Sequence, residues 1–459
     1  MSSCTLAALP AKIREGKPMG ENALVRVVTT HDFCCSYPPS PTSYGSLPGG
    51  EGLRRTVDAL HEEGPTVWAD AGDFAAPGAL AALSGGVAGF AAAADLGIDV
   101  GVAGNHEFEW GVEHLRSHAP KAGFPLLCAN APETGLAPKT IVETEAGAVG
   151  FVGLTCPDPE VYACAPRLET DLRWVVLGHA GTLRNSGADW VVVLLHDGVD
   201  WRFGREGYVA FPERFSAVCR PWAGSVDAIF ASHTLGRWIG RIQGTPVVQP
   251  WPFGAELGVV ELTRGEEPRA YCITPETGGR WTRTGSELLE EASARVLGEL
   301  EEPLFSRSGG SSPLTDSFAR ALREASGAHA AGVDMLAVQP PVDGVLSYLP
   351  AGPVTEADVL RLYPWPDSTV VGELGEEELR AVAQTPWPEP WSAWGFDAAD
   401  GAAVETVSLA VLEGDAADHV ERVVGRRVDW RRTGIGLREA VGEALRYHAA
   451  DTGRAGGGR

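Results

Sequence analysis

Short hydrophobic runs alternate with longer helical stretches through the first 275 residues of the chain. The stretches between the runs are rich in Ala, Leu and Gly. Strands that alternate with helices are typical of a layered α/β domain. The runs that we expect to be strands are Leu24–Thr29, Thr66–Trp68, Val100–Ala103, Val149–Leu154, Trp190–Leu195 and Ala228–Ala231, with two more within 245–263.

A change of pattern after residue 275 separates a second α/β region from the first. Between 284 and 304, apolar residues recur every four positions from Leu288 to Leu300, and Thr284 with Glu287 fits a capping box, so we expect one linking helix. The expected divisions are an N-terminal tail at 1–22, a first domain at 23–275, a linker helix at 284–304, a second domain at 311–448 and a disordered tail at 449–459.

The net charge of the chain limits the kinds of molecule that it can bind. The 459-residue chain carries a formal net charge of −24, which argues against binding to nucleic acid or to an anionic membrane surface. A small anionic substrate stays compatible, because a bound metal inverts the local charge. No apolar run reaches the roughly 18 residues of a membrane span, and the start lacks the order of a signal peptide. The scattered cysteines therefore read as free thiols, and we expect a cytoplasmic protein.

Polar residues follow the predicted strands at five separate strand ends. In open α/β sheets, ligands bind beyond the carboxyl ends of the strands, so these side chains are expected in one crevice. Any one of them alone would more often be a helix cap or a packed polar residue. Together, carboxylate, imidazole and amide groups suit a divalent ion such as Mn, Fe, Zn or Mg. The residues are Asp32, Asp73, Asn105, His106, His196 and His233.

In this order, the motifs resemble those of the calcineurin-like metallophosphoesterase superfamily, and within it the 5′-nucleotidase family. The family motifs D-x-H, G-D, G-N-H-E, a lone His and G-H-x-H read here as Asp32-Phe33-Cys34, Gly72-Asp73, Gly104-Asn105-His106-Glu107, His196 and Ser232-His233-Thr234-Leu235. The resemblance implies a four-layer metallophosphoesterase-type β-sandwich with flanking helices at 23–275. It also implies a 5′-nucleotidase-like C-terminal α/β domain at 311–448.

The same resemblance implies the metal ligands. Asp73 would bridge two ions, with the second site completed by Asn105, His196 and His233. The first site would use Asp32 and Cys34. Its last ligand position is held by Leu235, which cannot bind a metal. A Cys34 thiolate favours Zn or Fe, with Mn the remaining candidate. One or two ions are compatible with these residues.

By the same resemblance, His106 is the catalytic histidine and Glu109 the carboxylate that orients it. A spacing of three residues on a helical turn places Glu109 on the same face as His106, ready to fix its tautomer. Hydroxide formed at the metal centre would then attack phosphorus while His106 protonates the leaving oxygen.

The C-terminal half departs from the family pattern where it would bind substrate. The arginine that grips phosphate in the family is replaced by Leu346, which removes a bidentate contact. The family's P-F-x-N reads Pro364-Trp365-Pro366-Asp367. We expect Trp365 and Asp367 to bind substrate, with Trp365 stacking on a nucleobase-like ring, although plain packing explains a lone Trp about as well.

The sequence thus favours a metal-dependent hydrolase of a phosphate ester, acting on a nucleotide-like or phosphorylated small molecule. Fold alone does not fix the reaction, and two alternatives stay open. One is a repurposed mononuclear metal enzyme with different chemistry on a nucleoside-like substrate. The other is a non-catalytic nucleoside-binding protein.

Overall fold

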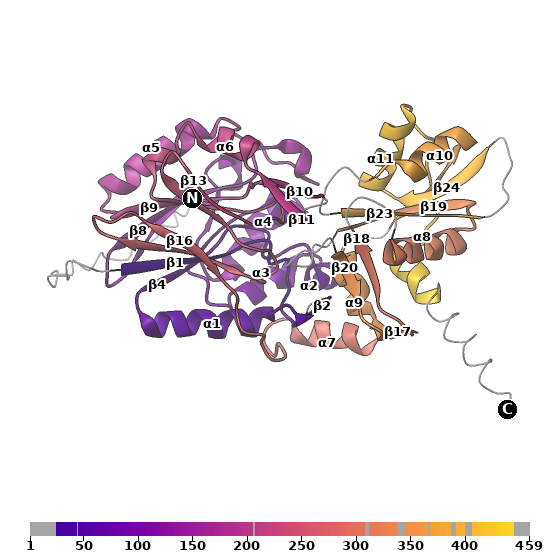
Figure 1. Cartoon of the computed structure of the whole chain (residues 1–459), viewed down its shortest axis with the longest axis horizontal. Helices are drawn as coiled ribbons and strands as arrows, with labels where there is room; N and C mark the ends of the chain where they lie inside the picture. Colours follow the sequence, from indigo (N-terminus) through magenta and orange to yellow (C-terminus); the bar gives the residue numbers. More distant parts are fainter. Residues whose placement is uncertain are drawn as a thin grey trace, which may run out of the picture.

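The computed structural model describes residues 24–43, 45–204, 207–307, 312–336, 345–365, 368–386, 392–399 and 406–444. Figure 1 shows two lobes side by side, an N-terminal lobe in indigo to pink and a C-terminal lobe in orange to yellow. The larger lobe is built on two six-stranded sheets. None of the helices in the described part is both long and apolar enough to cross a bilayer.

The first sheet is parallel in its centre and antiparallel at one edge. Strands β1, β4, β5 and β6 run parallel, whereas β15 and β16 pair antiparallel beside β1. In spatial order the strands are β16 (Arg269–Ile273), β15 (Leu257–Thr263), β1 (Leu24–Thr30), β4 (Thr66–Asp70), β5 (Val100–Val102) and β6 (Leu126–Leu127).

The second sheet has four parallel strands with an antiparallel strand at each edge. Its spatial order is β13 (Trp238–Ile242), β14 (Thr245–Gln249), β12 (Ala228–Ala231), β9 (Trp190–Leu195), β8 (Ala148–Leu154) and β7 (Lys139–Glu143). The two strands expected within 245–263 are β14 and β15, as predicted.

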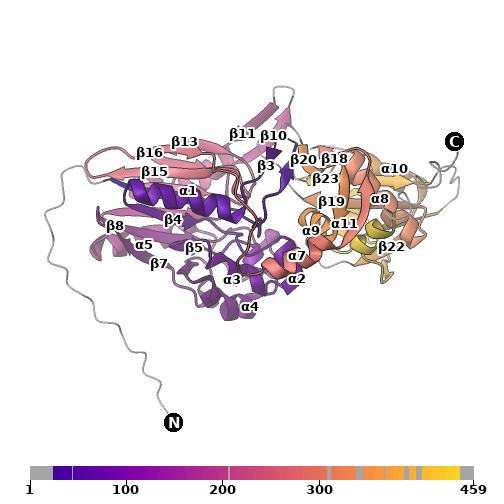
Figure 2. The ribbon, with the colours of Figure 1, turned by 90° about the horizontal axis from the view of Figure 1, so that it is seen from below.

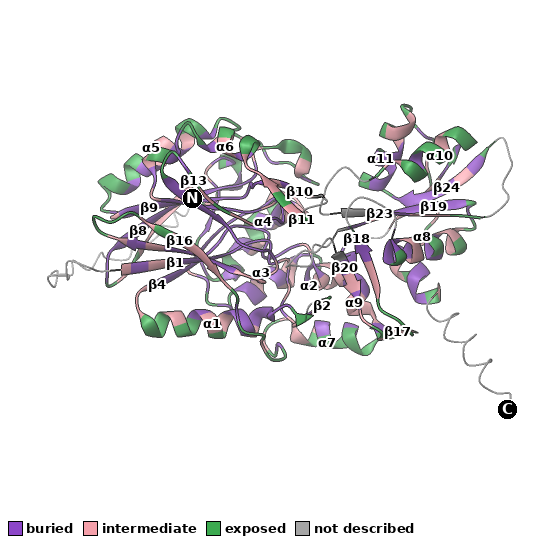
Figure 3. Cartoon of the chain, viewed as in Figure 1, coloured by how far each residue is buried: buried purple, intermediate pink, exposed green. Residues whose placement is uncertain are grey.

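Hydrophobic cores on both faces of each sheet produce four layers. Val27, Ala69, Phe151 and Phe230 belong to a core shared by the two sheets. Helices cover the outer faces, and Figures 1 and 3 show α1 below one sheet, with α5 and α6 above the other and green outward surfaces on these helices. The four-layer α/β architecture is therefore confirmed. Its helices are α1 (Gly49–Glu63), α2 (Ala79–Ser84), α3 (Val87–Ala93), α4 (Val112–His118), α5 (Leu172–Asn185) and α6 (Glu213–Cys219).

Two short antiparallel hairpins extend from this lobe. They are β2 (Pro41–Thr42) with β3 (Gly45–Ser46), and β10 (Asp200–Gly204) with β11 (Gly207–Phe211). In both views β10 and β11 lie on the side of the lobe that faces the C-terminal domain (Figures 1 and 2).

The C-terminal lobe is a smaller mixed α/β domain with its own core. Its central sheet has the order β23 (Ser392–Ala398), β19 (Ala330–Leu336), β24 (Val407–Leu412), β22 (Thr369–Leu374) and β25 (Arg431–Arg432). Its helices are α8 (Pro313–Ser326), α9 (Glu356–Leu362), α10 (Glu376–Gln384) and α11 (Asp415–Val424). Two strand pairs precede and flank them, β17 (Val296–Leu300) with β21 (Gly352–Thr355), and β18 (Leu304–Arg307) with β20 (Val345–Leu349).

The expectation of one helix over 284–304 is wrong in its second half. Helix α7 spans only Ser286–Ala294, and the chain then turns into β17. Pairing of β17 with β21 satisfies the backbone there and overrides the helical spacing of the side chains. The Thr284 capping box does not form either, because Gly285 is the N-cap residue and makes no side-chain hydrogen bond.

Candidate functional site

Three strand-end loops place candidate ligands in a strained backbone conformation. Asp32 follows β1, Asp73 follows β4 and His233 follows β12, with φ of 42°, 57° and 67°. Non-glycine residues rarely adopt positive φ, and such strain is concentrated at functional sites. Gly72 is required beside Asp73, because its φ is +101° and a Cβ there would lie 2.4 Å from Nδ1 of His196.

One buried carboxylate joins the loop after β4 to the loop after β5. Glu107 lies in a 3₁₀ turn (His106–Phe108) and is 1% exposed. Its oxygens accept hydrogen bonds from the backbone N–H groups of Asp73 (2.9 Å), Ala75 (2.9 Å) and Gly104 (2.7 Å). Burial, followed by the charge of Asp73, raises the pKa of Glu107 to about 7, while the three N–H donors oppose this shift. Glu107 therefore fixes the loop after β4 against the loop after β5.

The loops bring four of the predicted metal ligands together. The ligand atoms of Asp73, His196 and His233 all lie within 4.8 Å of one another. Nε2 of His196 lies 3.0 Å from Oδ2 of Asp73 and 3.0 Å from Oδ1 of Asn105. The Asn105 amide is oriented by its Nδ2–H, which donates to the carbonyl of Val161 (3.0 Å). Carboxylate, amide and imidazole atoms thus converge in the way that a divalent cation requires.

The other nitrogen of His196 is held by the protein. Nδ1 lies 2.8 Å from the carbonyl oxygen of Ala71, so it carries the proton and donates it. The Ser232 hydroxyl lies 3.0 Å from the same nitrogen. This tautomer directs Nε2 toward Asp73 and Asn105, an arrangement known from metal-binding histidines.

Charge is strongly coupled within this cluster. Burial alone would lower the pKa of His196, yet Asp73 raises that pKa to about 10. Burial and then the neighbouring His196 lower the pKa of His233 to about 4. Burial would raise the pKa of Asp73, but the histidines around it hold that pKa below its usual range. A neutral His233 beside an ionised Asp73 is a suitable donor pair for a metal.

His106 lies at the edge of the cluster and is paired as its spacing predicts. Its Nδ1 lies 2.9 Å from Oε2 of Glu109, and its backbone N–H donates to Oδ1 of Asp73 (2.9 Å). Burial alone would lower the pKa of His106, but Asp73 and then Glu109 raise it to about 9. Its Nε2 is left for a ligand, which suits a proton donor.

Asp32 is placed differently from Asp73. Its Oδ2 lies 2.5 Å from Nδ1 of the adjacent His31 and accepts the backbone N–H of His233 (2.8 Å). Nε2 of His31 faces the carbonyl oxygen of Pro250 at 2.7 Å. Both ring nitrogens of the buried His31 therefore face oxygen atoms of the protein.

Cys34 and Leu235 lie where the first metal site would need ligands. Cys34 lines the same pocket as Asp32 but is outside the described group of close ligand atoms. Burial, followed by Asp32 and Asp73, raises the pKa of its thiol well above the usual value. Leu235 is buried in an apolar cluster with Trp201 and Trp251. The roles of Asp32 and Cys34 as metal ligands stay predictions.

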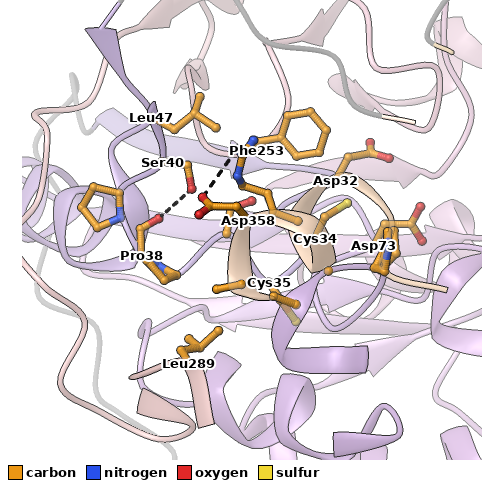
Figure 4. A pocket seen from close by; sticks show the side chains of 18 of the residues that line it. Asp32, Cys34, Cys35, Pro38, Ser40, Leu47, Asp73, Phe253, Leu289 and Asp358 are labelled. Atoms are coloured by element: carbon orange, nitrogen blue, oxygen red, sulfur yellow. Dashed lines mark hydrogen bonds and ion pairs between the residues drawn. The ribbon is translucent and has the colours of Figure 1, made fainter. Parts of the chain in front are cut away.

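A cavity of about 230 Å³ joins the cluster to the C-terminal domain. In Figure 4, Asp32, Cys34 and Asp73 lie toward one end, while Ser40 and Leu47 lie toward the other. From the C-terminal domain, α9 and the residues after it complete the wall, and the ring centroid of Trp365 lies 6.2 Å from that of His106.

Asp367 and the side chain of Leu346 lie outside the residues that the structure describes.

Sequence reasoning missed the roles of several site residues. Glu107 belongs to the G-N-H-E motif, but nothing in its residue type indicated three backbone contacts. His31 precedes the first Asp, and only its contact with Pro250, far along the chain, reveals its pairing. Arg361 lines the cavity from α9 and has no motif that could have indicated this.

Comparison with known proteins supports the resemblance to metallophosphoesterases that the two sheets and the residues at their strand ends suggest. Residues 49–237 match the family model for calcineurin-like phosphoesterases. A 5′-nucleotidase precursor from Thermus thermophilus superimposes with a TM-score of 0.70 at 18% identity, covering 93% of this chain and 97% of that one.

Two bacterial relatives are also similar in sequence. Endonuclease YhcR of Bacillus subtilis is 23% identical over 325 residues, and a 2′,3′-cyclic-nucleotide 2′-phosphodiesterase/3′-nucleotidase of Salmonella typhimurium is 26% identical over 202 residues. The matches cover 63% and 38% of this chain but only 26% and 31% of those relatives. The family match covers less than half of this chain, and the superposition shows a fold like that of a 5′-nucleotidase. Both findings support the resemblance that the motifs indicated.

The three contacts of Glu107 predict that the site is sensitive to this residue. In Glu107→Gln, an amide N–H₂ would face a backbone N–H, so we expect unfolding to require about 1–3 kcal/mol less free energy. Denaturant unfolding of the variant against wild type measures this loss. Glu113→Gln on the exposed face of α4 is the control and should change stability little. Equal stability of Glu107→Gln and Glu113→Gln would contradict the role of Glu107 in holding the two loops together.

Proposed function

We propose that the protein is a metal-dependent hydrolase of phosphate esters that acts on a nucleotide-like or other phosphorylated small molecule. The observation that carries this proposal is the convergence of Asp73, Asn105 and His196, with His233 close by and the His106–Glu109 pair at the edge. The family match and the nucleotide-related names of the relatives support the same class of reaction.

The donor set fits a divalent cation. Asp73, Asn105, His196 and His233 would hold it, and the nitrogen–oxygen set suits Zn, Fe or Mn. When bound, such an ion neutralises phosphate charge and activates water. Two oxygens, one from Asp73 and one from Asn105, converge on Nε2 of His196. This supports the fit, because the lone pairs of these three atoms repel one another unless a cation or a proton lies between them.

The chain's own residues would act on the leaving group. His106 is oriented by Glu109 and presents Nε2 to the cavity, from which it would donate a proton to the departing oxygen. Asp73 accepts the backbone N–H of His106 and so ties the acid to the ligand loop. Trp365 is part of the cavity wall that the C-terminal domain contributes, and it would supply a flat surface for a ring of the substrate.

A single tightly held ion is favoured over two. The position of one first-site ligand is filled by Leu235, packed against Trp201 and Trp251. Asp32 already accepts two hydrogen bonds, one from His31 and one from the backbone of His233. These contacts also support the second candidate, a mononuclear metal enzyme with altered chemistry on a nucleoside-like substrate. The described cysteines are all free thiols, which supports our proposal of a cytoplasmic location.

Metal content tests the ion count. We expect about one ion per wild-type chain after dialysis, because only the cluster around Asp73 has a full donor set among the residues that the structure describes. His196→Ala should lose most of it, whereas His61→Ala, on the exposed part of α1, should not. Elemental analysis of the three proteins makes the measurement. Two near-stoichiometric ions in wild type would show that Asp32 and Cys34 complete another site.

Replacement of His106 tests the proton donor. His106→Asn should lower turnover of a phosphate ester by about 10²–10⁴-fold, the usual range for loss of one general acid. Its metal content should stay at the wild-type level, since His106 is outside the close ligand group. Steady-state rates with elemental analysis of the same samples check both parts. Unchanged turnover would exclude this role, and loss of metal would make His106 a ligand instead.

Substrate choice can be tested at Trp365. If a nucleobase stacks on it, Trp365→Ala should weaken nucleoside or nucleotide binding by about 1–3 kcal/mol. Sugar phosphates, which have no aromatic ring, should be affected much less. Calorimetric titration of both ligand types measures the difference. Trp174→Ala removes an exposed Trp (65% exposed) on α5 and is the control. Equal effects on both ligand types would make Trp365 a packing residue.

A further inference from the structure

Helix α9 places one cation in the wall of the cavity. Of the described residues that line it, Arg361 is the only Lys or Arg, and it faces a lining that also contains Asp32, Asp73 and Asp358. Its side chain is only 21% exposed. Arg361 belongs to the C-terminal domain, whereas the candidate metal ligands all belong to the N-terminal domain.

The guanidinium of Arg361 is incompletely paired by the described residues. Its Nη2 donates to the carbonyl oxygen of Tyr348 (3.0 Å), and Oδ1 of Asp358 lies 4.0 Å away, beyond hydrogen-bond distance. The other oxygen of Asp358 is taken by Thr355, whose backbone N–H (2.9 Å) and hydroxyl (2.7 Å) both donate to it. A guanidinium has five N–H donors, so most of them are left for a ligand.

A largely buried charge that is incompletely paired is costly, and the free donors of Arg361 indicate which kind of ligand the site would bind. Burial lowers the pKa of Arg361, with Asp358 opposing the shift, but a guanidinium stays protonated near neutral pH. A ligand oxyanion would satisfy its free donors and offset the lost hydration. The position at which the resembled family carries its phosphate-binding arginine holds Leu346, so no cation comes from there.

We propose that Arg361 is an anion-binding residue of the cavity and contacts an oxyanion group, phosphate or carboxylate, of the bound molecule. The proposal rests on the proposed function only for the identity of the substrate. Recognition of negative charge would then come from α9 as well as from the metal cluster. The planar guanidinium of Arg361 matches an oxyanion through two parallel hydrogen bonds.

Binding of inorganic phosphate to the full-length, metal-loaded protein tests the proposal by calorimetry. We expect Arg361→Gln to weaken phosphate binding by about 10- to 100-fold, the scale of one charge-assisted hydrogen bond. Arg361→Lys keeps the charge and should lose less. Arg380→Gln is the matched control, because Arg380 is exposed on α10 and pairs with Glu376 at 2.7 Å. A parallel titration with acetate shows whether carboxylates bind as well as phosphate.

Three outcomes would overturn the proposal. They are no measurable phosphate binding by wild type, unchanged binding by Arg361→Gln, and an equal loss in the Gln and Lys variants together with reduced thermal stability or metal content. The last outcome would mean that Arg361 only holds β20 through Tyr348. Phosphate binding is measured without turnover, so a protein that hydrolyses no phosphate ester would disprove the proposed function and leave this result intact.

Discussion

The carboxylate of Glu107 holds the loop after β4 and the loop after β5 together at the centre of the site. It accepts N–H groups from the loop after β4 and from the loop after β5, and it is sealed from water. Asp73 on the first loop and Asn105 on the second can then both reach Nε2 of His196. Asp73 also accepts the backbone N–H of His106, so the expected proton donor is positioned by the same carboxylate.

The Asp32 side of the site is stabilised by other means. Nδ1 of His31 lies 2.5 Å from Oδ2 of Asp32, in the place where the resemblance predicted metal coordination. Leu235 packs into an apolar cluster instead of presenting an imidazole. A buried carboxylate needs a positive or hydrogen-bonding partner whatever the partner is, and His31 with the backbone of His233 meets that need. The fold therefore keeps Asp32 without requiring a second ion.

The sequence was sufficient for the layers and for the strand-end residues, because both follow from local patterns. Alternating strands and helices predicted the α/β sheets, and the three-residue spacing of His106 and Glu109 predicted their contact. The prediction of a linker helix was wrong in its second half, because β17 pairs with β21 although its side chains have a helical spacing. Arg361 and His31 also escaped prediction. Their partners, such as Pro250, are contributed by distant segments or by backbone carbonyls, which carry no residue signature.

The overall charge of −24 and an anionic substrate are compatible only if positive charge is concentrated locally. A divalent ion in the Asp73 cluster would supply part of it, and Arg361 would supply more from the opposite domain. Surface charges are screened over about 8–10 Å in physiological salt, so the acidic exterior repels a ligand in the cavity only weakly. The side chain of Arg361 is only 21% exposed, so its charge is screened less than that of a surface arginine. The placement of a few buried groups, rather than the net charge, therefore decides which ligands this cavity accepts.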